Sequence, residues 1–346
     1  MGSPSGYAQL VPKLRFLKAS LLPADTYKEL IGAKSLEETV AILRDTPYSE
    51  AARARDPEAV QEEVLRVLIE RLRRLERYAP SEARLLLQAF YREEEARDLL
   101  ILARAVQEGR GSRVRLPTAR IEGSLLSIIA REPEALGSLQ RLQEVFDRTW
   151  IKPYLREASR IAGEVKSGEA YTWYTLALSV LLYVDALKKL DVRERLGVEN
   201  IICPFITYRI TNAMTNAKDM GLPMRTLDRV MEKVEICGFK WKEFRAVYER
   251  EVDPQSLLAA LKEVFAKLLL DTKLHYSEAL EAARKAAYKL AASKALSAYA
   301  SYPFRPAIVA AAGTLAKIEA MDVQAILAGK LMRLPAEALE GLTINI

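Results

Sequence analysis

Apolar residues that recur every three or four positions constrain this chain more than any other feature. Between residues 58 and 78 they are Val60, Val64, Leu65, Leu68, Leu72 and Leu75. Glutamate and arginine fill the opposite face, which is the pattern of an amphipathic helix with one buried side. Asp56 and Pro57 supply an N-cap and a first-turn proline, and Pro80 follows the end of the run. The sequence therefore predicts a helix over residues 58–78.

Capping residues mark the starts of two more helices. Ser35 with Glu38 has the spacing of a capping box, and the pair Asp253-Pro254 repeats the Asp-Pro start. Convincing runs that alternate apolar and polar residues, as half-buried strands do, are absent from the sequence. We therefore predict an all-α protein.

A weak internal repeat suggests how the helices are grouped. Three segments place a short polar residue before an apolar helical run that is followed by a glycine. Their anchors are Asp98, Asn212 and Asp322, which lie 114 and 110 residues apart. Glu95 and Glu319 stand three residues before the first and third anchors, and Arg209 takes that place in the middle copy. A unit near 110 residues is too long for short helical solenoids and predicts three successive helical subdomains.

The charge balance is mildly basic. The chain has 52 lysines and arginines against 46 acidic residues, a formal net charge of +6 over 346 residues. This excess suits a soluble protein that meets an anionic partner, and it is weaker than the basic patch of a dedicated nucleic-acid binder. A helical-repeat adaptor or a nucleic-acid-binding protein stays an alternative, and phosphate binding would make affinity fall steeply with salt.

Residue types that carry common chemistries are scarce. His275 is the one histidine, which excludes multi-histidine metal centres, and we interpret it as a structural residue. Cys203 and Cys237 are too few for a disulfide framework and lack zinc-finger spacing. The one Gly-Lys pair, Gly329-Lys330, lacks the rest of a phosphate-binding loop, and no G-x-G-x-x-G occurs. We expect no catalytic residue, no cofactor and no metal.

Paired carboxylates remain a possible site. Glu95 with Asp98, and Glu319 with Asp322, are three residues apart and share a helix face, so a hydrolase could use them as an acid and base pair. Charged helices carry this spacing commonly, and we prefer a polar network or a contact between subunits or subdomains. The residues that we predict for this network are Glu95, Asp98, Arg104, Arg209, Asn212, Glu319 and Asp322.

Two other clusters have a structural and a functional interpretation. The aromatic residues Tyr171, Trp173, Tyr174 and Tyr183 could form a partner-binding stripe, and we prefer a buried core. The arginines Arg71, Arg73, Arg74 and Arg77 could bind phosphate, and we prefer a solvated helix face because Glu70 and Glu76 are interleaved. The longest uncharged apolar stretch, residues 170–184, is shorter than the ~20 residues that span a bilayer. We expect a soluble chain that could sit on a membrane complex.

Several local sequences resemble one known family along nearly the whole chain. They are Tyr7, Arg15 to Leu22 with Leu21-Leu22-Pro23, Tyr27-Lys28-Glu29-Leu30, Leu43-Arg44-Asp45-Thr46-Pro47-Tyr48, Glu95-Ala96-Arg97-Asp98-Leu99 with Arg104 and Gly109, Tyr302-Pro303-Phe304, Glu319, Asp322, and Ile326 to Leu334-Pro335. Together they resemble the C subunit of archaeal A-type ATP synthases, which is related to the d subunit of eukaryotic V-type ATPases. The family's anchor helices usually have an asparagine where this chain has Asp98 and Asp322, and an acidic residue where it has Arg209.

The resemblance implies an all-helical funnel of three similar subdomains around a pseudo-threefold axis. We place their boundaries at residues 1–120, 121–232 and 233–346. In the family, the funnel caps the cytoplasmic face of the proteolipid ring and its cavity receives the D/F-type rotor shaft. The resemblance thus implies a non-catalytic rotor coupler, peripheral to the membrane, that needs no nucleic acid.

Overall fold

A computed structural model describes residues 4–264, 273–301 and 303–344. Almost all regular structure in these residues is helical, which confirms the predicted all-α class. Contacts divide the chain into two compact units. Unit 1 comprises the described residues of Met1–Tyr91, Lys189–Ile202 and Tyr288–Ile346, and unit 2 those of Arg92–Lys188 and Cys203–Ala287. The three subdomains and their pseudo-threefold arrangement stay predictions.

Three long helices contribute residues to both units. They are α7 (Ser81–Gln107), α11 (Val192–Asp219) and α15 (Tyr276–Tyr299). The other elements of unit 1 are α1 (Pro4–Tyr7), α2 (Leu10–Ala19), α3 (Ala24–Gly32), α4 (Leu36–Leu43), α5 (Ser49–Arg53), α6 (Pro57–Glu76), α16 (Pro306–Leu331) and α17 (Ala336–Leu342). Those of unit 2 are the short 3-10 helices η1 (Gly111–Arg113), η2 (Pro117–Arg120), η3 (Leu125–Ile128) and η4 (Pro133–Gly137), then α8 (Leu139–Val145), α9 (Lys152–Val165), α10 (Glu169–Leu187), α12 (Met224–Met231), β1 (Glu235–Ile236), β2 (Phe239–Lys240), α13 (Trp241–Arg250) and α14 (Pro254–Val264).

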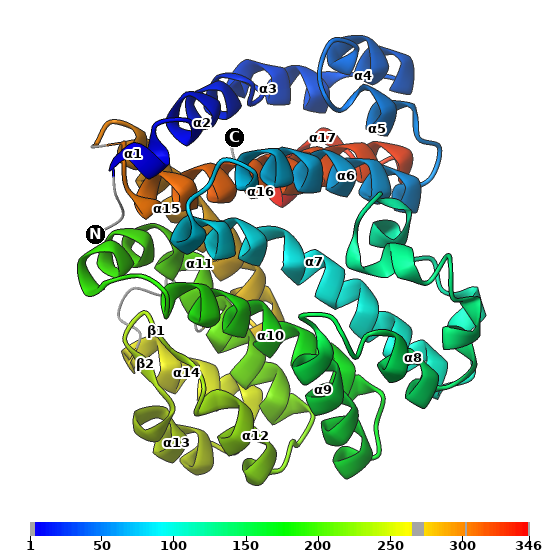
Figure 1. Ribbon diagram of the computed structural model, residues 1–346, viewed down its shortest axis with the longest axis vertical. Coiled ribbons are helices and arrows are strands. Elements are labelled where there is room, and N and C mark those ends of the chain that lie inside the picture. Colours follow the sequence, from blue (N-terminus) through cyan, green and yellow to red (C-terminus); the bar gives the residue numbers. More distant parts are fainter. Residues whose placement is uncertain (1–3, 265–272, 302, 345–346) are drawn as a thin grey trace. The chain divides into compact units, whose positions relative to one another are not determined.

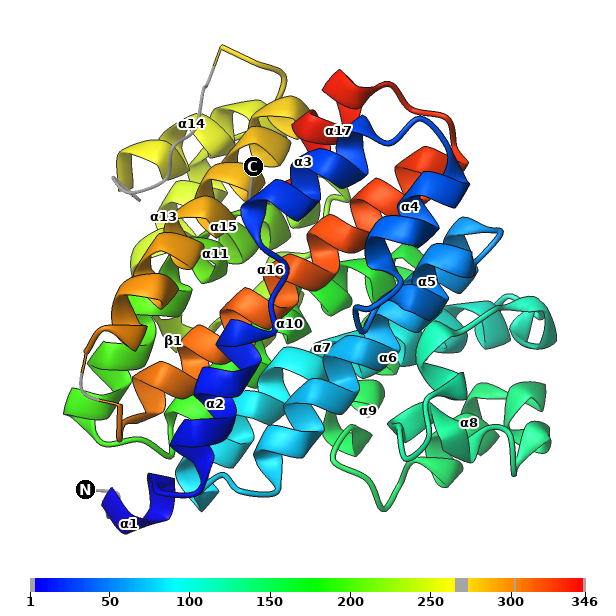
Figure 2. The same ribbon diagram turned by 90° about the horizontal axis from the view of Figure 1, so that it is seen from above.

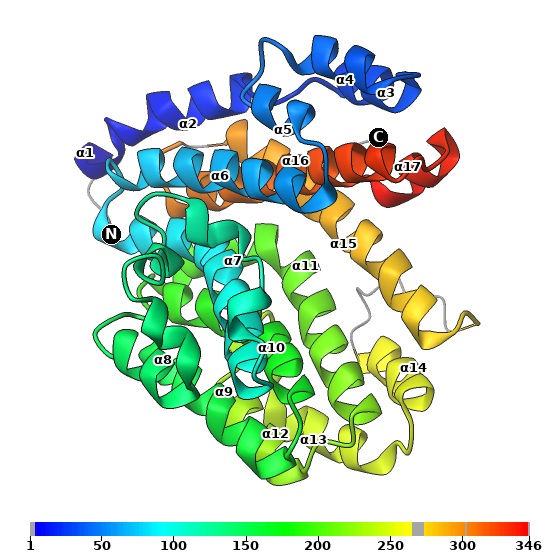
Figure 3. The ribbon, with the colours of Figure 1, turned by 90° about the vertical axis from the view of Figure 1, so that its right-hand side faces the viewer.

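Unit 1 is built around α16. This helix lies beside α6, and α2 packs against both (Figures 2 and 3). Most residues of α16 are buried on every side, as expected of a helix at the centre of a core. Gly313 brings α16 close to α7, because a Cβ at this position would lie 2.4 Å from the ring of Phe90.

The predicted helix starts are confirmed. α6 begins at Pro57, and the Asp56 side chain accepts a hydrogen bond of 2.8 Å from the Ala59 amide. Ser35 caps α4 in the same way, and the carboxylate of Glu38 accepts from the amide of Lys34 at 2.6 Å. Asp253 accepts from the amide of Ser256 at the start of α14. These caps satisfy amide groups that the first helical turn leaves without partners.

Unit 2 is organised around α10, which packs side by side with α9 (Figure 1). The aromatic residues Tyr171, Trp173, Tyr174 and Tyr183 on α10 are all buried, so the core interpretation is confirmed. Among the described residues, α10 alone is long and apolar enough to pass as a candidate membrane span. Since 72% of that stretch is buried inside the fold, it has the character of a core helix.

A short hairpin and a disulfide lie at one end of unit 2. β1 and β2 pair antiparallel, with Ile236 opposite Phe239. Cys237 in the turn is bonded to Cys203 of α11, and their Cα atoms are 5.4 Å apart. The chain thus has a single bridge in place of a framework.

The ends of the anchor helices differ from one copy to the next. Gly109 and Gly221 follow α7 and α11 with positive φ angles of 71° and 60°, as helix-terminating glycines do. In the third copy Gly329 lies inside α16, and Arg333 adopts the left-handed conformation instead. Gly329 is needed there for packing, because a Cβ would lie 2.3 Å from the side chain of Leu339.

Candidate functional site

Glu319 is the centre of a buried polar network in unit 1. It projects from α16 and is 1% exposed. Its carboxylate accepts hydrogen bonds from the amide of Leu22 at 2.6 Å and from the hydroxyl of Tyr48 at 2.8 Å. Arg71 of α6 forms an ion pair with the same carboxylate. Burial and the adjacent Glu319 carboxylate raise the pKa of Tyr48 well above its ordinary value, so this hydroxyl stays a donor.

Asp322, one helical turn later, holds a second segment of unit 1. Its Oδ1 atom accepts from the amide of Ile344 at 2.7 Å, at the end of the segment after α17. Asp322 is also 1% exposed. The two carboxylates of α16 therefore tie the N-terminal and C-terminal segments of the chain to one helix.

Glu95 and Asp98 of α7 tie other segments of unit 2 to this helix in the same way. Glu95 accepts from the amide of Leu125 at 3.0 Å, and Asp98 accepts from the amide and the hydroxyl of Thr118 at 2.9 and 2.8 Å. Both carboxylates are buried. Burial raises the pKa of Asp98, although the nearby guanidinium of Arg97 and the bonds from Thr118 act in the opposite direction.

The middle copy replaces the carboxylate with a cation. Arg209 of α11 pairs with both carboxylate oxygens of Glu93. Its guanidinium also lies over the rings of Phe205 and Tyr183, at 5.0 and 5.7 Å from their centroids. Asn212, one turn on, accepts a hydrogen bond of 2.8 Å from the side-chain amide of Asn216. Two opposite charges and two aromatic rings therefore occupy the position equivalent to a single carboxylate.

Arg104 is the most exposed of the predicted residues. Its side chain is 37% exposed and bonds to Glu108 at 2.9 Å and to Thr172 at 3.2 Å. The structure therefore gathers Glu319 with Asp322 on α16, and Glu95 with Asp98 on α7, into two separate networks. The contacts of Arg209, Asn212 and Arg104 given above are made with other residues.

The buried carboxylates of these networks act as tethers: each accepts a hydrogen bond from the backbone of a segment distant in the sequence. The carboxylates of Glu95, Asp98, Glu319 and Asp322 accept bonds from backbone amides and are at most 2% exposed. An acid and base pair must reach a substrate proton, and these groups have no exposed face that could do so. Within the described residues, no cluster of histidine, cysteine and carboxylate side chains is arranged to hold a metal ion.

Several side-chain partners of these networks, Thr118 among them, were outside the sequence prediction. Tyr48 and Arg71 complete the Glu319 network, and Glu93 completes the Arg209 pair. For Arg71 the interpretation as a solvated residue is wrong, since its side chain is 11% exposed. No local signal separates these arginines, because Arg71 directly precedes the buried Leu72 and the exposed Arg74 directly precedes the buried Leu75.

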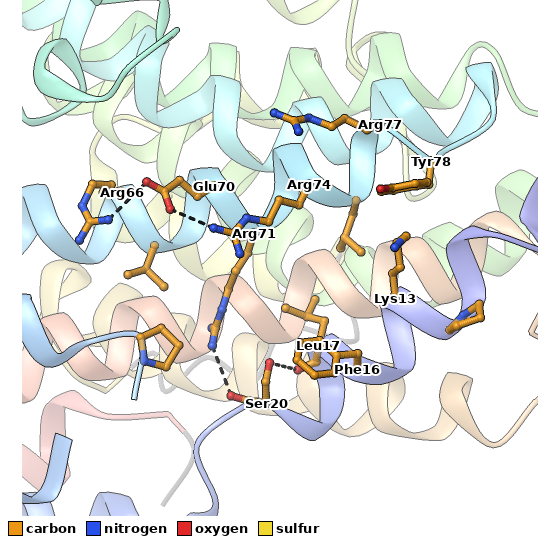
Figure 4. A pocket seen from close by; sticks show the side chains of 14 residues that line it. Lys13, Phe16, Leu17, Ser20, Arg66, Glu70, Arg71, Arg74, Arg77 and Tyr78 are labelled. Carbon is orange, nitrogen blue, oxygen red and sulfur yellow. Dashed lines mark hydrogen bonds and ion pairs between the residues drawn. The ribbon is translucent and has the colours of Figure 1, made fainter. Parts of the chain in front are cut away.

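The face of α6 that carries Arg66, Glu70 and Arg74 borders a groove of about 860 Å³ in unit 1. α2 forms the other wall, and the residues that line the groove include Lys13 and Phe16 from α2 and Arg66, Arg71, Arg74 and Tyr78 from α6 and its end (Figure 4). Arg71 therefore joins the groove to the Glu319 network beneath it.

Comparison with known protein families places this arrangement in context. Residues 10–342 match the family described as ATP synthase (C/AC39) subunit. No curated protein matches the chain. The family match covers both units, all the anchor helices and the groove. The chain therefore belongs to the ATP synthase (C/AC39) subunit family, a family of A/V-type ATPase subunits.

Proposed function

We propose that the chain is a non-catalytic central-stalk subunit of an A/V-type ATPase, which couples the rotor shaft to the proteolipid ring. The observation that carries the proposal is the family match over residues 10–342. In this role the chain binds D/F-type shaft subunits on one side and the proteolipid ring on the other. It lies on the cytoplasmic side of the membrane and does not enter the lipid.

The buried networks support a mechanical role. A coupler must transmit torque without yielding, and closely packed helices deform little. Glu319, Asp322, Glu95 and Asp98 add tethers that join segments distant in sequence to the long helices. Breaking such a tether leaves a buried donor without a partner, which costs ~1–3 kcal/mol. The tethers therefore resist local opening under load.

The test is a reconstitution with the full chain. An A/V-type complex depleted of this subunit is assayed for ATP hydrolysis and for ion transport, with and without added chain. We expect transport to depend on the added chain, and the chain alone to hydrolyse no ATP. Affinity purification of the tagged chain from gently solubilised membranes should recover shaft and proteolipid subunits together.

Two variants test whether coupling depends on the stability that a buried tether provides. Arg131→Glu changes an exposed residue, and Glu319→Ala removes a buried tether. Transport should survive Arg131→Glu and fall with Glu319→Ala in step with thermal stability. Transport that does not depend on the added chain, or purification that recovers neither shaft nor ring, would refute the coupling role.

A further inference from the structure

The groove between α2 and α6 carries positive charge that the buried networks do not neutralise. Its walls carry the cations Lys13, Arg66, Arg71, Arg74 and Arg77, and Glu70 is the single carboxylate among the lining residues. Arg66 is held by Glu63 and Glu70 at 2.6 and 3.3 Å, and Arg71 by Glu319. The positive charge that remains is therefore concentrated at the end formed by Lys13, Arg74 and Arg77.

These three cations are weakly neutralised within the described residues. The Arg74 side chain is 76% exposed and its one ion-pair contact, with Glu70, is 3.7 Å long. Arg77 is exposed and has no carboxylate in contact among the described residues. The ammonium of Lys13 lies 4.0 Å from the centroid of the Tyr78 ring, a cation–π contact that leaves its charge intact.

Exposed aromatic side chains stand beside this charge. Phe16 is 75% exposed and Tyr78 is 40% exposed, and Figure 4 shows both with Lys13 at one end of the groove. The groove is also lined by Leu17, Val67 and Leu75. Aromatic and arginine side chains around an apolar depression are typical of the central part of protein interfaces.

The length of the groove indicates the shape of its occupant. Its lining residues on and after α6 run from Arg66 to Tyr78, which at 1.5 Å per helical residue corresponds to ~18 Å. The charged positions 66, 70 and 74 are four residues apart and share one face of α6, and Arg77 follows directly after the helix. A compact phosphate would reach only one or two of these groups, whereas a helix of about twelve residues matches the length.

We propose that the α2/α6 groove binds an acidic amphipathic segment of a partner protein. Carboxylates of the segment pair with Lys13, Arg74 and Arg77, and its apolar face packs on Phe16, Tyr78 and the apolar lining of the groove. Arginine is suited to this task because its planar fork binds carboxylates at two points. This inference is independent of the coupling role, because the segment could belong to any partner.

The test measures binding of a defined probe to the full chain. The probe is a fluorescein-labelled helical peptide of about twelve residues with glutamates on one face and leucines on the other. Its twin carries lysine in place of glutamate. We expect saturable binding of the acidic peptide, weaker binding at higher salt, and no binding of the lysine twin.

Substitutions in the groove test whether the peptide binds there. Arg74→Glu with Arg77→Glu should weaken binding by roughly tenfold or more, and Phe16→Ser should weaken it without changing its salt dependence. The matched control, Arg131→Glu with Lys233→Glu, makes the same charge change at two exposed residues outside the groove. All changes are at exposed positions, and melting curves check that the variants are folded.

Three kinds of outcome would overturn the assignment. The first is non-specific binding, seen either as equal binding of the two peptides or as equal loss in the groove and control variants. The second is displacement of the peptide by inorganic pyrophosphate at lower concentration than the peptide itself, which would indicate a small polyanion. The third is binding to vesicles containing anionic phosphatidylserine, lost in the groove variant, with no binding of the acidic peptide. That result would indicate a lipid surface.

Discussion

Arg71 and Glu319 stand 248 residues apart in the chain and form an ion pair between α6 and α16, in which Glu319 is buried and Arg71 is 11% exposed. The Tyr48 hydroxyl and the Leu22 amide share the same carboxylate. Two helices of unit 1 and two of its connecting segments therefore meet at one side chain. Because removal of one partner of a buried pair leaves the other charged and unpaired, Glu319 is the position where a small change has the largest expected effect.

Glu319→Ala should lower the free energy of unfolding by about 3–5 kcal/mol, since it leaves Arg71 buried without its counter-charge. Glu319→Gln should cost less, because its one amide oxygen can still accept from Tyr48 and Arg71, although the Leu22 amide, which bonds to the other carboxylate oxygen, loses its acceptor. Urea unfolding followed by circular dichroism measures both. Glu337→Ala, at an exposed position of α17, is the control and should change little. An equal effect of the two alanine variants would contradict the network.

Asp98→Asn tests the cost of a buried carboxylate. Burial raises the pKa of Asp98, so the folded state holds the proton more tightly than the unfolded state. The wild-type protein should then lose stability as the pH rises from the ordinary carboxylate range through the folded pKa. The asparagine variant lacks this loss and keeps an oxygen that accepts from Thr118.

The stability difference between Asp98→Asn and wild type should therefore grow in favour of the variant as the pH rises from about 4 through the folded pKa of Asp98, and should stay constant above it. Thermal melts at a series of pH values measure this difference. Asp98→Ala is the matched control, because it also removes the acceptor of the Thr118 amide and should cost ~1–3 kcal/mol. If asparagine were as damaging as alanine at pH 7, ionised Asp98 would be a stabilising group.

The buried Lys317 should give the free energy of unfolding a second pH dependence, opposite in sign to that of Asp98. Burial in α16 lowers the pKa of its ammonium from 10.5 to about 7. Between these values the unfolded state binds more protons than the folded state, so the free energy of unfolding should rise with pH from about 7 to about 10.5. The rise should amount to roughly a few kcal/mol.

Lys317→Met removes the titrating group and should flatten this part of the stability profile. Chemical unfolding at pH 7, 8, 9 and 10 provides the measurement. Lys242→Met, at an exposed position of α13, should leave the slope of the wild-type profile in place. A slope that survives Lys317→Met would assign the pH dependence to other groups.

Two glycine substitutions of the same kind should have opposite effects. Gly313→Ala would place a Cβ 2.4 Å from the Phe90 ring, so the helices must separate at a cost of ~1–3 kcal/mol. Gly163→Ala, inside α9, meets no atom within 4 Å and should raise stability by ~0.5–1 kcal/mol. Melting temperatures of the two variants, compared with that of the wild-type protein, measure both effects. Equal destabilisation by both would mean that helix packing at Phe90 is not the cause.

Local sequence was sufficient to predict the helices and their starts. The cap at Asp56, the capping box at Ser35 and the buried aromatic stripe of α10 all follow from residues within a few positions of one another. The class of fold follows from the same short-range pattern. The carboxylates of the anchor helices could also be identified, because their spacing places each pair on one face.

Long-range partners could not be predicted in this way. Arg71 and Arg74 differ by three positions in one basic run, yet one is buried against α16 and the other faces solvent. The difference is set by where α16 lies, which no local pattern records. For the same reason Glu93 could not be assigned to Arg209, 116 residues away, and the groove could not be anticipated from α2 or α6 alone.

The bond between Cys203 and Cys237 makes part of the stability of unit 2 conditional on its chemical surroundings. It closes a loop of 34 residues, for which chain-entropy models give ~3–4 kcal/mol. In a reducing cytosol the two thiols separate and this contribution is lost, whereas an oxidising cell interior keeps it. The thermal stability of unit 2 is therefore set by the redox balance of the cell as well as by the packing of its helices.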